Sequence, residues 1–202
     1  MDLIAIVDAN ILFPYALRDT VLRAANERFF RVRWSATILD ELQRNLVSKH
    51  IVSTDKALRL RTRLEEVFPK ANVTNFEHLI PAMPNHIKDR HVVAAAVRAG
   101  AEIIATANMK DFRQLPHGII ALPPDQFLCR LFEMSPERFV NMLRQQARDM
   151  QKPPQTCDGL LAHLSQTAPR LIEKVREFHE SESPPITFRH QHDNDRSDNG
   201  KQ

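Results

Sequence analysis

The chain has 202 residues, 43% of them hydrophobic, which suffices for one domain with a packed core and a smaller second part. Its net charge of +3 is compatible with a phosphate-bearing partner but does not require one. The two cysteines lack zinc-site or disulfide-framework spacing, and no apolar run reaches the ~18 residues of a membrane span. The N-terminus begins with an acid and has no basic region, so we expect a soluble cytoplasmic protein without a membrane contact.

Short apolar runs alternate with amphipathic segments over the first 122 residues. Strands are predicted at 3–7, 31–34, 102–106 and 118–122, with a further candidate at 72–76. Helices are predicted at 19–30, 35–50, 54–68 and 89–99, and residues 79–88, which contain two prolines, are predicted to form a loop. This alternation indicates an α/β fold with a central parallel sheet.

The pattern changes after Pro123, where helical segments follow one another without strands. These helices are predicted at 124–133, 136–150 and 158–179, with a break at 152–155. From residue 183 the chain is polar and has too few apolar residues to form a core. We therefore predict three parts: an α/β domain (1–123), a helical extension (124–180) and a disordered tail (181–202).

Four acids fall where a parallel sheet gathers its ligands, at the carboxyl ends of the strands. Asp8 directly follows the first strand, and Asp111 lies in the loop after the strand at 102–106. Asp89 opens the helix that precedes that same strand, so it starts at the same edge. Glu41 lies about two turns into its helix beside apolar residues, where a charge is costly unless it is paired.

Carboxylates that lie this close would take up protons unless a cation neutralises them. Their hard oxygen atoms suit Mg²⁺ or Mn²⁺, and Asn10, Thr106 and Asn108 could orient them or hold water. A site of this kind suits hydrolysis of phosphodiester bonds. The sequence has no GxSxG, HExxH, Walker A or GxGxxG motif, so no other catalytic pattern competes.

Four segments resemble, in their order, the PIN domains and in particular the VapC-like toxins of toxin–antitoxin pairs: VDANIL, ILDELQRNL, DRHVVAAAVRAGAEIIAT and TANMKDF. The resemblance covers about residues 3–122. It implies a PIN-like three-layer α/β/α fold with a central parallel sheet, Mg²⁺-dependent ribonuclease activity, an RNA substrate and a cognate antitoxin, and it raises a homodimer as an expectation. The additional C-terminal helices are similar to those of some longer VapC-like proteins.

Residue by residue, the resemblance places the catalytic, metal-binding quartet on Asp8, Glu41, Asp89 and Asp111. It places Asn10 and Thr106 on polar positions near the metal, with Asn108 as a third.

Each acid also has a simpler interpretation. Asp8 and Asp111 could belong to turns, Glu41 to an exposed helix face, and Asp89 could be a helix cap that also binds metal. His91 could contact RNA or be a packed or solvated histidine.

Two alternative functions remain open at this stage. A receiver-type signalling module also uses acids and a hydroxyl residue at this sheet edge, but it needs adjacent acids after its first strand, where this chain has Ala9 and Asn10. A PIN-like scaffold that only binds a protein partner is the other.

Overall fold

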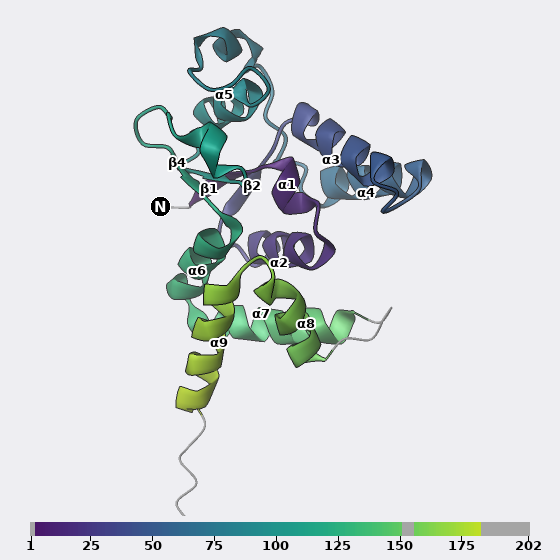
Figure 1. Ribbon diagram of the computed structural model, residues 1–202, viewed down its shortest axis with the longest axis vertical. Helices are drawn as coiled ribbons and strands as arrows, with labels where there is room; N and C mark the ends of the chain where they lie inside the picture. The colour runs from purple at the N-terminus through teal and green to yellow at the C-terminus, as the bar shows by residue number, and fades with distance from the viewer. Residues whose placement is uncertain (1–2, 151–155, 183–202) are drawn as a thin grey trace, which may run out of the picture.

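A four-stranded parallel sheet forms the centre of the computed structural model, which describes residues 3–150 and 156–182 (Figure 1). The strand order is β2-β1-β3-β4. The strands are β1 (Ile4–Val7), β2 (Arg31–Arg33), β3 (Ile103–Ala105) and β4 (Ile120–Leu122). The predicted α/β class with a parallel sheet is confirmed, although the candidate strand at 72–76 forms only an isolated bridge from Asn72 to Trp34.

Helices cover both faces of this sheet. Figure 1 shows α5 on one side and α2 with α6 on the other, so the first part of the chain has three layers. In chain order the helices are α1 (Ala9–Leu12), α2 (Tyr15–Asn26), α3 (Ala36–Ser48), α4 (Thr54–Val67), η1 (Glu77–Ala82), α5 (Arg90–Ala99), η2 (Met109–Phe112), α6 (Pro124–Met134), α7 (Pro136–Asp149), α8 (Cys157–Ser165) and α9 (Pro169–Glu182).

The structure corrects three of the predicted elements. The helix expected at 158–179 is two helices, α8 and α9, because Pro169 has no N–H to donate and its ring would clash with the carbonyl one turn earlier. The helix expected at 19–30 is α2, which starts and ends four residues earlier, and the single turn α1 was not predicted. The predicted loop at 79–88 begins inside the 3₁₀ helix η1.

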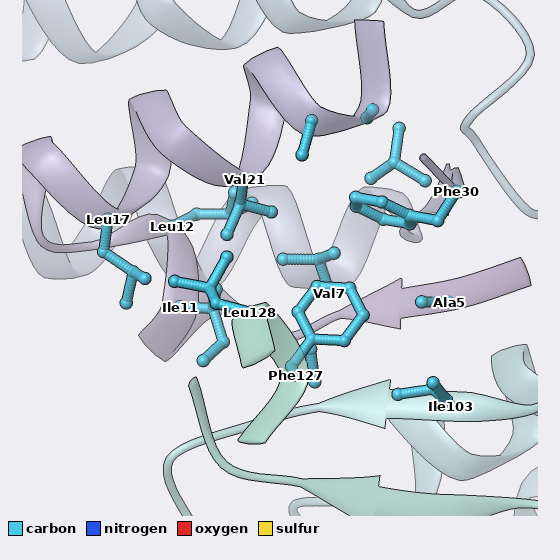
Figure 2. Close-up of a cluster of buried hydrophobic side chains, with 14 of the residues drawn as sticks. Ala5, Val7, Ile11, Leu12, Leu17, Val21, Phe30, Ile103, Phe127 and Leu128 are labelled. Atoms are coloured by element: carbon cyan, nitrogen blue, oxygen red, sulfur yellow. The ribbon is translucent and has the colours of Figure 1, made fainter. Parts of the chain in front are cut away.

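The C-terminal helices share the hydrophobic core of the sheet. Figure 2 shows Phe127 and Leu128 of α6 among side chains of β1, α1 and α2, and the rings of Phe30 and Phe127 meet edge to face at 5.0 Å. Gln146 of α7 is fully buried and accepts a 2.9 Å hydrogen bond from the hydroxyl of Thr20 in α2. The division into an α/β domain and a helical extension therefore stays a prediction.

Two predicted features fall on residues that are not described. The break at 152–155 lies outside the described residues. The tail predicted at 181–202 does so from residue 183 onward, whereas Ser181 and Glu182 are the last residues of α9. Within the described part of the chain, no helix combines the length and the apolar character that a membrane crossing requires.

Candidate metal centre

Asp8 lies at the carboxyl end of β1, next to β3. Its backbone N–H donates to the carbonyl of Ala105 (3.0 Å), which continues the pairing of the two strands. Its side chain is only 5% exposed and caps α1: Oδ1 accepts from the N–H of Ala9 (2.7 Å). Oδ2 accepts from the Thr106 hydroxyl (2.7 Å) and from Nδ2 of Asn10 (2.6 Å). The carboxylate is thus buried and held in one orientation.

The three polar residues predicted around the acids form a continuous chain of hydrogen bonds from Asp8 to Asp111. Asn10 also donates to the Thr106 hydroxyl oxygen (3.1 Å), which accepts from the backbone N–H of Asn108 (3.1 Å). The side chain of Asn108 then donates to Oδ2 of Asp111 (2.6 Å). The carboxylate of Asp111, in η2 after β3, is thereby tied to the same edge as Asp8.

Asn85 is a positioning residue that the sequence did not reveal. It is 6% exposed, and its Nδ2 donates to the backbone carbonyls of Asp111 (2.9 Å) and Gln114 (3.0 Å). The backbone carbonyl of Asn85 accepts from Nε of Arg90 (2.9 Å), at the start of α5. Asn85 therefore joins the loop that carries Asp111 to the helix that follows Asp89. In the sequence, Asn85 is marked only by its place after Pro84 in a segment predicted to form a loop.

The other two acids interact electrostatically with this pair. Burial raises the pKa of Asp8, the Thr106 hydrogen bond opposes that rise, and the charge of Glu41, half-buried on α3, adds to it. Burial also raises the pKa of Asp89, and the charge of Asp111 raises it further. Asp89 occupies the N-cap position of α5 but makes no side-chain capping bond, and its Oδ2 lies 3.9 Å from Nδ1 of His86.

His91 belongs to the site, rather than to a solvated helix face. It is half-buried, and its buried Nδ1 atom makes no hydrogen bond of standard geometry within the described residues. Burial lowers the pKa of His91, while the charges of Asp8 and Asp89 oppose the change. The imidazole therefore lies within electrostatic reach of both acids, and its contact with RNA stays a prediction.

The donor set fits a hard divalent cation that keeps part of its water. Within residues 3–150 and 156–182, no group of three or more His, Cys, Asp and Glu side chains lies close enough together to hold a metal ion, so the four predicted acids do not form a single ligand cluster. The acids instead interact as Asp8 with Glu41 and as Asp89 with Asp111. Mg²⁺ is commonly held by only one or two carboxylates and several waters, so this arrangement suits it. Burial raises the pKa of Asp8 and of Asp89, and a bound cation would favour the charged form of both carboxylates.

Comparison with known proteins gives two family matches and one relative. The PIN domain profile matches residues 5–110, and a profile described as the VapC50 C-terminal domain matches residues 124–177. A protein of Mycobacterium tuberculosis named "Putative ribonuclease VapC50" is 39% identical over 112 residues. That alignment covers 54% of this chain and 66% of the relative, just under two thirds of its length.

Proposed function

The chain belongs to the PIN-domain family, and from this premise we propose that it is a divalent-metal-dependent endoribonuclease. We further propose that it is the toxin of a type II toxin–antitoxin pair, with a cognate antitoxin protein as its partner. The name of the mycobacterial relative supports both the RNA substrate and this biological role. A homodimer remains part of the proposal as a family expectation.

Each acid has a specific role in this proposal. Asp8, Glu41, Asp89 and Asp111 would hold Mg²⁺ or Mn²⁺ at the carboxyl edge of the sheet. When bound, the ion would supply Lewis acidity to the phosphoryl group and activate water for attack. Asn10 and Thr106 hold the Asp8 carboxylate by the hydrogen bonds given above, and Asn108 holds that of Asp111.

One observation carries the proposal: the Asp8 carboxylate is buried at the end of a strand although burial and Glu41 both disfavour its charge. An acid that served only to end a strand would be more stable if exposed to water. A buried acid with further acids within electrostatic reach is typical of functional sites, because a bound cation reverses the penalty.

The test is cleavage of total RNA by the full chain, with and without Mn²⁺. Asp8→Asn and Glu41→Gln should each lower the rate by about 100-fold or more, because each removes charge that stabilises the bound ion. Asp40→Asn is the matched control: Asp40 precedes Glu41 on α3, but it is exposed and pairs with Arg61 of α4. This control should retain the wild-type rate.

Circular dichroism must show that all three variants are folded. An active Asp8→Asn protein, or cleavage that does not depend on a divalent ion, would refute the proposed mechanism. Failure of the folded wild type to bind Mn²⁺ would favour the scaffold alternative. The antitoxin is tested separately, by asking whether the product of an adjacent small reading frame copurifies with the chain and suppresses the cleavage.

A further inference from the structure

A basic groove runs between α6 and α9, in the part of the chain that the nuclease chemistry does not use. Its volume is about 520 Å³. The floor includes Leu122 and Cys129, and the charged residues that line it are Arg130 and Glu133 of α6 with Arg170 and Lys174 of α9. Four charged side chains therefore line this groove beside its apolar surface.

The charge of the lining is predominantly positive. Three cations and one acid leave two positive charges in excess (3 − 1). Glu133 is already paired with Lys174 (3.0 Å), whereas Arg130 and Arg170 are exposed and have no ion pair within the described residues. Burial raises the pKa of the Cys129 thiol to about 11, so the floor is neutral at pH 7 and offers no thiolate to a metal. Arg130 and Arg170 are therefore the groups in the groove that can bind an anionic ligand.

Two contacts hold the walls of the groove together. The carboxylate of Asp125 in the first turn of α6 accepts the backbone N–H of Leu171 in the first turn of α9 (3.0 Å). One to two turns further along, Lys174 and Glu133 form their ion pair. The two helices are thus joined in their first turns and again at the Lys174–Glu133 pair. These contacts fix the position of the backbone that carries Arg130 and Arg170.

The groove begins at the same edge of the sheet as the acids. Leu122, which lines it, is the last residue of β4, and its carbonyl accepts the backbone N–H of Thr106 (3.0 Å). Thr106 in turn donates its hydroxyl to Asp8. Leu122 of the groove is therefore joined by one backbone hydrogen bond to Thr106, the residue that orients the Asp8 carboxylate.

We propose that this groove binds the phosphate backbone of the single-stranded RNA on one side of the scissile bond. The inference rests on the proposed nuclease function and adds a second binding site to it. Arginine matches phosphate through a planar pair of donors, and a floor of Leu122 and Cys129 has no aromatic ring on which a base could stack. Contact with the backbone alone makes the site indifferent to base sequence. The groove extends the length of RNA that the protein contacts, but it does not determine which bond is cleaved.

The test compares two RNA lengths with two matched double variants of the full chain. R130Q/R170Q removes the two groove arginines, and R148Q/R176Q removes one exposed arginine each from α7 and α9, outside the groove. Fluorescence anisotropy in EDTA measures binding of single-stranded RNAs of about 4 and about 20 nucleotides over a range of salt concentrations. Cleavage of both RNAs is then measured in Mn²⁺.

For the longer RNA, R130Q/R170Q should bind on the order of tenfold more weakly, and its salt slope should fall by about 1.4, the value for two lost phosphate contacts on a single strand. Binding and cleavage of the short RNA should stay at wild-type values, as should all properties of R148Q/R176Q.

Three results would overturn the inference: no effect of R130Q/R170Q, an equal loss in R148Q/R176Q, or an equal loss with both RNA lengths. A polyglutamate peptide provides the remaining comparison. If only its binding falls in R130Q/R170Q, the groove serves an acidic protein segment and not RNA. Binding of the longer RNA that depends on the groove, without metal-dependent cleavage of either RNA, would support the groove and refute the nuclease proposal.

Discussion

Replacing Thr106 with valine tests whether the Asp8 carboxylate is held ready for a cation. Thr106 is fully buried, and its hydroxyl donates to Oδ2 of Asp8 at 2.7 Å. The Thr106 hydroxyl oxygen itself accepts from the side chain of Asn10 and from the backbone N–H of Asn108. Valine has a similar shape but no hydroxyl, so the substitution removes one charge-assisted hydrogen bond and leaves two donors without their acceptor.

The structure sets the size of this effect. A hydrogen bond to a charged group contributes about 1.5–3 kcal/mol, and both partners here are buried, so solvent provides no replacement. Thr106→Val should therefore lower the free energy of unfolding by about 2–3 kcal/mol at about pH 7.5. Because the Thr106 hydrogen bond holds the pKa of Asp8 down, its loss raises that pKa further. Protons then compete more strongly with a metal ion, so Mn²⁺ should bind more weakly, and increasingly so as the pH falls.

Urea unfolding measures the first quantity, and calorimetric titration with Mn²⁺ from about pH 5 to about pH 8 measures the second. Thr106→Ser is the control, because it keeps the hydroxyl and removes only a methyl group. It should retain the wild-type pH dependence of Mn²⁺ binding. If Thr106→Val binds Mn²⁺ with the affinity and pH dependence of the wild type, Asp8 is not a ligand oriented by Thr106, and the reasoning fails.

Three other predictions concern the supports of the site and the core. Asn85→Ala removes two hydrogen bonds from the loop that carries Asp111, so calorimetry should show Mn²⁺ affinity lower by about tenfold; an unchanged affinity would contradict a positioning role. Gln146→Ala removes the buried bond to Thr20 and leaves a cavity, so urea unfolding should show a loss of about 2–4 kcal/mol, and a loss well under about 1 kcal/mol would argue against a shared core. Because burial raises the pKa of Asp8, the folded protein keeps a proton at a pH where the unfolded chain has released it. Without metal, the wild type should therefore lose stability relative to Asp8→Asn as the pH rises through that raised pKa; thermal melts showing a pH-independent difference would exclude this.

The sequence predicts the framework of the site well because strand ends carry a strong pattern. The apolar run before Asp8 and the run before Thr106 each define a buried strand, and parallel pairing then brings both residues to one edge. Gly100 likewise ends α5 with the positive φ (61°) expected of a helix C-terminal glycine. These predictions depend only on local pattern and on one rule of topology.

Contacts that depend on tertiary packing are not predictable in this way. Asn85 lies in an irregular segment, and the carbonyls to which it donates come from a loop 26 and 29 residues later. His91 is one residue in an alanine-rich helix, and nothing in the helical pattern shows that it lies near Asp8 across the sheet edge. Single-turn helices such as α1 also escape notice, because four residues are too few to show a period.

The insertion of α6 beneath the sheet has a consequence for how the molecule is made. Phe127 and Leu128 are synthesised after every strand, yet they seal the apolar face that those strands present. Until Phe127 and Leu128 have been synthesised, the nascent chain would expose this apolar face of the sheet to water. A premature stop codon just past β4 would consequently yield a chain that fails to fold, not a smaller folded domain.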